Sequence, residues 1–124
     1  MPLSAVVRER CRALLPAGTE IRYLFPASVS LVGALVQKPF IIAITDKHVI
    51  LLECSWLSHD RPKAVHTRYR RAIRLGPVDT AFDPVFRIAG IDYQTWDEYV
   101  SVIRAADAEI AEEDFLPPDP LPDL

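Results

Sequence analysis

The sequence predicts an α+β protein that is mainly β, in which a bent antiparallel sheet or partial barrel of about six or seven strands carries a helix at each end. Three observations lead to this prediction. Two runs of branched apolar residues flank a short polar turn between Pro39 and Cys54. Other short alternating segments are bounded by Pro or Gly, and an amphipathic segment with helical spacing begins at Trp96.

The hairpin over residues 39–54 is the clearest element. Residues 40–44 and 49–52 are rich in Ile, Val and Leu, which suit the pleated, half-buried surface of a strand. Asp46 and Lys47 lie between the two runs and form the expected turn. Strands joined this closely run antiparallel, so the hairpin sets the class of the domain.

Toward the N-terminus the pattern predicts a helix and then one or two strands. Ser4 is suited to cap a helix over residues 4–14. Residues 20–25 alternate in polarity and form a strand that Pro26 ends. The apolar residues 29–37 form either a second strand, bent at its glycine, or a buried loop, and we favour the strand.

After the hairpin we expect a loop over residues 55–63 and a strand over residues 64–70. Alternation divides this strand into an inward face and an outward face. The inward face holds Val65, Thr67 and Tyr69, and the outward face holds His66, Arg68 and Arg70. The alternation of inward and outward residues shifts by one position at Arg71, so a bulge or tight corner is expected there. In the segment that follows, Ile73 and Leu75 should face inward.

The C-terminal third predicts one more strand, over residues 84–89, a turn at Gly90 and a long helix. Residues 95–98 (TWDE) match a capping box, so the helix should begin there and end near Glu113. Its apolar stripe must lie on the sheet or seal its open end, and comprises Trp96, Tyr99, Val100, Ile103, Ala106 and Ile110. Residues 114–124 are acidic and rich in Pro, which predicts a disordered, extended tail.

Length and composition predict a single domain over residues 1–113. The chain has 124 residues, half of them hydrophobic, which is enough for one core. The longest apolar stretch, residues 29–36, is too short to span a bilayer, and the N-terminus lacks the long apolar region of an export signal. We therefore expect a soluble cytoplasmic protein, either free or peripheral at the inner face of the membrane.

Charge is unevenly distributed along the chain. Residues 1–91 carry thirteen Lys and Arg against seven Asp and Glu, whereas residues 92–124 carry one Arg against ten acids. The acidic C-terminal part is either a solvated face or a mask over the basic part.

The element order resembles that of pleckstrin-homology-like domains, and within them the bacterial PH-like and GRAM-like groups. Leu15–Ala27 (LPAGTEIRYLFPA) resembles their opening strand, Ala43–Leu52 (AITDKHVILL) resembles their hairpin, and Arg70–Val78 (RRAIRLGPV) fits a later strand. The likeness covers roughly residues 15–112. Thr19 stands where Glu is usual, and the N-terminal helix and Pro-rich tail are additions.

This resemblance implies a PH-like fold and a role in binding. Such domains often bind phosphoinositides or anionic membrane surfaces through basic strand and loop residues. By position, the nearest equivalents here are His66, Arg68 and Arg70.

The main candidate site is a run of six cations within fourteen residues. The six cations are Arg61, Lys63, Arg68, Arg70, Arg71 and Arg74. His66 lies in the same segment and is also a candidate. Guanidinium groups spaced two apart on one strand face can converge on an anion such as phosphate. The alternative is a solvated strand face that the acidic terminal helix neutralises.

Trp56 and Leu57 form an apolar pair in the loop before this strand. With cations on either side, they could dip into a membrane surface. The alternative is that they fold back onto the core, which is the commoner fate of large apolar side chains.

Neither the histidines nor the cysteines form a recognisable catalytic or metal-binding pattern. The spacing of His48, His59 and His66 does not demand a metal, and Cys11 and Cys54 are expected to be buried, reduced thiols. With only four glycines, the chain has no Gly-rich phosphate loop. We therefore predict no catalytic residue, no metal and no cofactor.

Together these observations predict a non-catalytic binding or adaptor module that contacts a partner protein and, through the basic strand, anionic lipid headgroups. The alternative is a small enzyme or a cofactor- or ligand-binding protein that uses the interior of the curved sheet. An exposed sheet edge is a candidate surface for self-association. The acidic terminal segment argues against nucleic acid, and the Pro-rich tail is a docking peptide, a mask or a disordered end.

Overall fold

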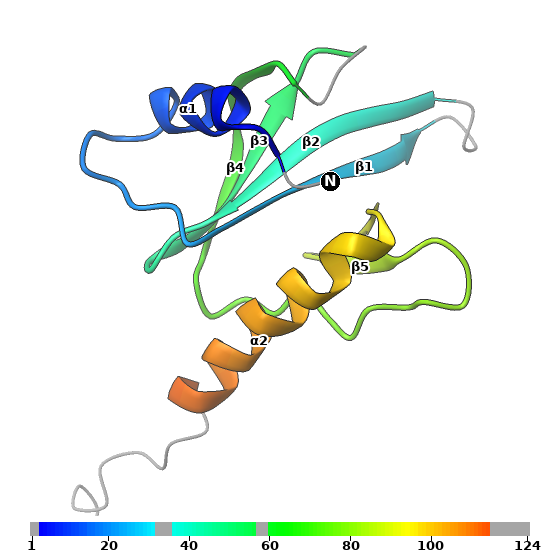
Figure 1. Ribbon diagram of the computed structural model, residues 1–124. Coiled ribbons are helices and arrows are strands. Elements are labelled where there is room, and N and C mark those ends of the chain that lie inside the picture. The colour runs from blue at the N-terminus through cyan, green and yellow to red at the C-terminus, as the bar shows by residue number, and fades with distance from the viewer. Residues whose placement is uncertain (1–2, 32–35, 57–59, 115–124) are drawn as a thin grey trace, which may run out of the picture.

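The computed structural model describes residues 3–31, 36–56 and 60–114 (Figure 1). In this part of the chain, two helices flank six strands in sequence. The elements are α1 (Ala5–Ala13), β1 (Tyr23–Leu31), β2 (Val36–Ile44), β3 (His48–Cys54), β4 (Pro62–Arg70), β5 (Val85–Ile88), β6 (Ile91–Gln94), a 3₁₀ turn η1 (Asp97–Tyr99) and α2 (Val100–Asp114).

All six strands form one antiparallel sheet, in the order β4-β3-β2-β1-β6-β5. The sheet is open, with β4 and β5 as its edges, and the predicted class, α+β and mainly β, is confirmed. Self-association through an edge stays a prediction.

Helices cover both faces of the sheet, with α1 on one side and α2 on the other (Figure 1). Under α1, Val7 and Cys11 pack against apolar residues of β2 and β3. On the opposite face, Ile103 of α2 packs against a cluster that includes Phe25 and Phe86. Because β2 and β3 are buried on both sides, their apolar runs are continuous, as in other strands with two covered faces. The prediction of a half-buried hairpin is therefore wrong.

The N-terminal helix forms as predicted. Ser4 is its N-cap, and the Ser4 side chain accepts a hydrogen bond from the Val7 amide at 3.3 Å. This bond satisfies an amide that has no partner inside the helix.

Pro26 does not end the first strand, as the sequence predicted, but lies inside β1, which runs on to Leu31. The Pro26 carbonyl accepts a hydrogen bond from the hydroxyl of Thr95 at 2.7 Å, on the side away from β2. In an extended strand the amide of a residue points the same way as its carbonyl, so the proline removes no hydrogen bond of the β1–β2 ladder.

The apolar segment 29–37 is not one strand. Its first part completes β1 and its last part begins β2, with Leu31 opposite Val36. Gly33 falls between them, outside the described residues.

The second half of the sheet is a tight hairpin that joins β1 only briefly. Ala89 and Gly90 connect β5 to β6 with φ angles of 51° and 84°, as a two-residue turn with both residues left-handed requires. β6, where the sequence predicted only a turn, pairs with β1 at Ser28 and Gln94. We call this single pairing, with the Thr95 bond to β1, the seam.

The predicted capping box is absent from the start of the C-terminal helix. The Thr95 hydroxyl is directed to β1, and the N-terminal turn is η1, with Trp96 as an N-cap that makes no side-chain capping bond. Trp96 is exposed and does not belong to the apolar stripe, whereas Tyr99, Ile103 and Ile110 are buried as predicted.

The helix α2 ends at Asp114, and residues 115–124, where the tail was predicted, lie outside the described residues. No helix in the described part of the chain has the length and apolar character needed to cross a membrane.

Candidate functional site

A bulge in β4 divides the predicted basic site between two faces of the sheet. The pairing of β3 with β4 changes register between Leu51 and Leu52, so His66 is an extra residue in β4. As a result Val65 packs in the cluster under α1, whereas Tyr69 packs in the cluster on the α2 side. Val65 and Tyr69 were predicted to share a face of the sheet. This prediction is wrong, because the bulge lies between them.

His66 and Lys63 lie near a carboxylate on the α2 side of the sheet. The His66 ring meets Phe40 edge-on, with 5.2 Å between centroids, and its Nδ1 is 4.0 Å from Oε2 of Glu53. Glu53 accepts a hydrogen bond from Lys38 Nζ at 2.7 Å. That bond and the Lys38 charge, with smaller contributions from His66 and Lys63, hold the pKa of Glu53 below its usual range. These two candidates are therefore separate from the arginines that follow them in β4.

Arg71 is turned toward α2. Its Nη2 donates to the Ala106 carbonyl at 2.9 Å and to Glu109 Oε2 at 3.2 Å. This contact matches the expected tight corner after Arg70, although residues 73–75 form no strand. The helix α2 thus pairs one of its acids with one arginine of the basic run, and the mask interpretation stays a prediction.

Arg74 borders a groove along α2 with Arg104 and Asp107. The Asp107 carboxylate accepts the backbone amides of Leu75 and Gly76 at 3.0 and 2.8 Å, which fixes this segment to α2. Arg74 is therefore also remote from the α1 face.

Arg68 and Arg70 are the candidates that lie on the α1 side. Arg68 pairs with Ile50, which is buried under α1, and Arg70 pairs with His48 two residues earlier in β3. Directly paired residues project from the same face of a sheet. Both arginines are exposed and lie on the face of the sheet that α1 covers, with Arg70 at the end of β4 nearest the β2–β3 turn.

The helix adds arginines that the sequence analysis did not assign to the site. Its exposed residues include Arg8, Arg10 and Arg12, and Arg10 Nη1 donates to the Asp60 carbonyl at 2.7 Å. This bond holds α1 against the segment that carries Arg61. We define the basic surface as Arg8, Arg10, Arg12, Arg61, Arg68 and Arg70.

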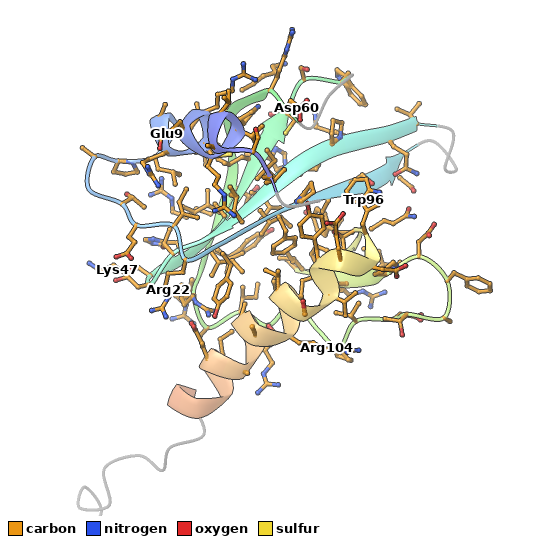
Figure 2. The ribbon with its side chains drawn as sticks, viewed as in Figure 1. Glu9, Arg22, Lys47, Asp60, Trp96 and Arg104 are labelled. Atoms are coloured by element: carbon orange, nitrogen blue, oxygen red, sulfur yellow. The ribbon has the colours of Figure 1, made fainter. Side chains whose placement is uncertain are left out.

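The acids near the basic surface are few. Glu9 is paired with Arg12, and Asp60 lies where the segment before β4 contacts α1 (Figure 2). The exposed Asp46 and Lys47 of the β2–β3 turn lie near His48, the partner of Arg70, and offset each other in charge, so the six arginines keep a positive excess over Glu9 and Asp60. Arg68 and Arg70, two residues apart in one strand, are separated by about 6.5 Å along the chain and can contact neighbouring anionic groups.

Trp56 is 50% exposed, so its folding back onto the core, the commoner alternative, is wrong. Lys38 Nζ lies 4.8 Å from the centroid of its ring. Lys38 precedes Pro39 and contacts Glu53, so Trp56 lies toward the α2 side and away from the basic surface. Leu57 and His59 lie outside the described residues, and the membrane-loop prediction remains a prediction.

The two thiols are buried as expected. Burial raises the pKa of Cys11 to about 11 and that of Cys54 to about 12, so neither is an activated nucleophile. The space between the sheet and α2 is filled by Phe25, Phe86, Ile103 and their neighbours. Among the described residues, no group of three or more His, Cys, Asp or Glu side chains is arranged to hold a metal.

No protein-family model matches this chain, and no curated protein or solved structure resembles it closely enough to count as a match. The resemblance to PH-like and GRAM-like domains therefore stays a prediction from the sequence.

Proposed function

We propose that the protein is a non-catalytic binding module that docks its basic surface on anionic phospholipid headgroups. The observation that carries the proposal is the convergence of α1 and β4, which present arginines from two distant parts of the chain on one side of the sheet. The predicted PH-like resemblance points the same way.

The form of the surface supports a broad anionic target. The helix α1, the edge strand β4 and the residue just before β4 contribute the arginines, so the charges are spread over several parts of the structure. Each Lys or Arg near an anionic membrane contributes about 1 kcal/mol. A net excess of roughly four charges then gives about 4 kcal/mol, which corresponds to an enrichment of about a thousandfold at the surface. Binding of this kind is reversible and weakens steeply with salt.

The packed interior supports binding without catalysis. Apolar side chains fill the space between the sheet and α2, where the alternative of an enzyme or cofactor-binding protein would need converging polar groups. The buried thiols have raised pKa values, which is the opposite of what nucleophilic catalysis requires.

Co-sedimentation with phosphatidylcholine vesicles, with and without phosphatidylserine, tests the proposal across a salt series. The wild type should bind only the anionic vesicles, and less as salt rises. The Arg68→Glu/Arg70→Glu variant changes the surface by four charges and should lose about a thousandfold in binding. The matched control is Arg87→Glu/Arg104→Glu, which makes the same change on exposed positions of β5 and α2.

The control variant should bind as the wild type does. Equal losses in both variants would mean that net charge alone drives binding, and failure of the wild type to bind at low salt would refute the lipid-docking role. Circular dichroism and melting temperatures establish that each variant is folded.

A further inference from the structure

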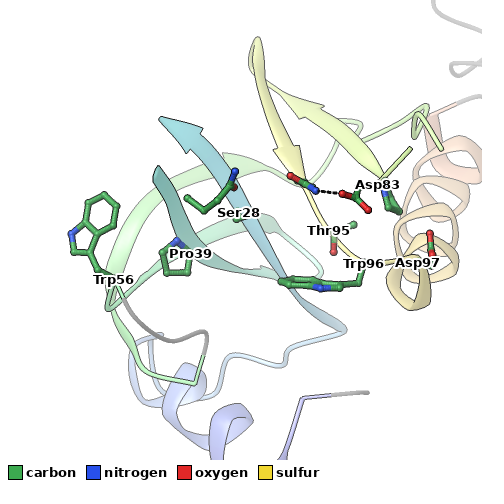
Figure 3. A pocket seen from close by; sticks show the side chains of 10 residues that line it. Ser28, Pro39, Trp56, Asp83, Thr95, Trp96 and Asp97 are labelled. Atoms are coloured by element: carbon green, nitrogen blue, oxygen red, sulfur yellow. Dashed lines mark hydrogen bonds between the residues drawn. The ribbon is translucent and has the colours of Figure 1, made fainter. Parts of the chain in front are cut away.

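A cleft of about 500 Å³ lies where β2, the end of β6 and the start of η1 meet (Figure 3). It is separate from the basic surface. Its lining residues come from both halves of the sheet, and include Ser28 of β1, Gln37 and Pro39 of β2, and Asp83, Gln94 and Asp97 near the β5–β6 hairpin. A volume of this order is typical of a small-ligand or side-chain site.

The two tryptophans of the chain both border this cleft. Trp56 is 50% exposed and Trp96 is 46% exposed, and Pro39 is seen between them in Figure 3. Indoles provide large, rigid contact surfaces and are enriched among the residues that dominate binding energies. Two of them exposed at one cleft therefore indicate a binding site.

The polar side chains of the cleft offer both hydrogen-bond donors and acceptors, and its two carboxylates only accept. Gln94 Nε2 donates to Asp83 Oδ2 at 2.7 Å, as the dashed line in Figure 3 shows, and Gln37 Nε2 donates to Ser30 Oγ at 2.7 Å. Each bond uses an amide hydrogen within the protein. The carboxylates of Asp83 and Asp97 can only accept, whereas each glutamine has a carbonyl oxygen that can accept and a second amide hydrogen that can donate.

The charge of the cleft is negative. Asp83 and Asp97 line it, and none of its described lining residues is Lys or Arg. The nearby Lys38 is paired with Glu53 at 2.7 Å. Lys38 also lies over Trp56, with Nζ 4.8 Å from the ring centroid, so this indole already holds one cation against its face.

We propose that the cleft binds arginine side chains of a basic segment in a partner protein. A guanidinium stacks flat on an indole, and its five N–H groups can donate to the carboxylates of Asp83 and Asp97 and to the glutamine carbonyl oxygens. The two carboxylates supply the opposite charge. A proline-rich segment or a neutral sugar could stack on the tryptophans, but neither would gain from the negative charge. The negative charge of the cleft favours a cation.

Intrinsic fluorescence tests the proposal directly, because Trp56 and Trp96 are the only tryptophans in the chain. The probe is a short peptide of alternating Gly and Arg, titrated beside peptides in which Lys, Gln or Pro replaces Arg, and beside a neutral oligosaccharide. The Arg peptide should change the emission saturably, and the Lys peptide should bind several-fold more weakly.

Variants of the cleft give the second part of the test, with binding measured by calorimetry. Trp96→Ala should weaken binding of the Arg peptide about tenfold, which is the loss expected for one partly desolvated cation–π contact. Asp83→Asn/Asp97→Asn keeps the shape of both side chains and should weaken binding by tenfold or more and flatten its salt dependence. Asp46→Asn, which removes an exposed acid from the β2–β3 turn, is the matched control and should bind normally.

Several outcomes would overturn the proposal. Equal binding of the Arg and Gln peptides would remove the role of charge, and full affinity in the Asp83→Asn/Asp97→Asn variant would do the same. Tighter binding of the Pro peptide or of the oligosaccharide would assign the cleft to another class of ligand. The absence of saturable binding at millimolar Arg peptide would reject it altogether.

Discussion

Replacing Glu109 with Gln should destabilise the fold at neutral pH, because this carboxylate joins α2 to both ends of the β1–β4 meander. Glu109 Oε1 accepts the Tyr23 hydroxyl at 2.6 Å and Arg22 Nη2 at 3.0 Å, and its Oε2 accepts Arg71 Nη2 at 3.2 Å. The Gln variant keeps one acceptor oxygen, so the Tyr23 bond is weakened and the two charge pairs are lost.

The magnitude follows from the exposure of the partners. Arg71 is 13% exposed and Glu109 is 31% exposed, so this pair is partly shielded from water. Arg22 is 48% exposed and contributes little. About 1 kcal/mol for the Arg71 pair and about 0.5 kcal/mol for the other contacts give a loss of about 1.5 kcal/mol. For a chain of this size that is a fall in Tm of about 5 °C.

The destabilisation should depend on pH. The hydrogen bond from Tyr23, and then the charges and bonds of Arg22 and Arg71, hold the pKa of Glu109 below its usual range in the folded protein. A lowered folded pKa contributes stability that is present above the unfolded pKa of about 4.3 and is lost as the pH falls through the folded pKa. The difference in the free energy of unfolding between wild type and variant is therefore largest at neutral pH and disappears in acid.

Urea unfolding across an acid-to-neutral pH series measures this difference. The matched control is Asp92→Asn, which breaks the exposed Arg87–Asp92 pair of the β5–β6 hairpin and should change Tm by no more than about a degree. The reasoning would be refuted if the loss of unfolding free energy in Glu109→Gln did not vary with pH, or if it were no larger than the loss in the control variant.

Three further predictions concern buried groups. Thr95→Val keeps the shape of the side chain but leaves the Pro26 carbonyl without its donor, and should cost about 1–3 kcal/mol in urea unfolding, while Thr80→Val, at an exposed position, should cost little. Ile103→Ala empties a fully buried position between α2 and the sheet and should cost about 2–5 kcal/mol by thermal unfolding; a smaller loss would mean that the site collapses around the cavity. Cys11 and Cys54 should resist a thiol reagent in the native state and react in urea, because burial shields them and raises the pKa of their thiols, so rapid native labelling would contradict their placement.

Features set by neighbouring residues were predictable from the sequence. The Ser4 cap and the turn at Asp46 depend on side chains within three or four positions, and both are where they were expected. The capping box at Thr95 failed because its hydroxyl has a second acceptor, the Pro26 carbonyl, 69 positions away in the chain. A local pattern carries no information about such a distant competitor.

In the candidate site too, features that depend on neighbouring residues were predictable, and features that depend on distant contacts were not. Alternation predicted that Arg68 and Arg70 share a face, and they do, since no bulge separates them. The separation of His66 from them depends on the register of β4 against β3, which residues 64–70 alone do not specify. The α1 arginines join the surface only because α1 packs on that face, so their role required the tertiary structure.

The narrowness of the seam bears on the order in which the protein folds. The strands β1 to β4 pair with chain neighbours, so their hairpins close over short loops and lose little chain entropy. β6 reaches β1 through the single Ser28–Gln94 pairing, and the Arg22–Glu109 bond joins residues 87 positions apart. We therefore expect the meander to form first and the β5–β6 hairpin with α2 to dock on it in a later, slower step. Amide exchange should then be slowest in β2 and β3, and transient opening should begin at β6.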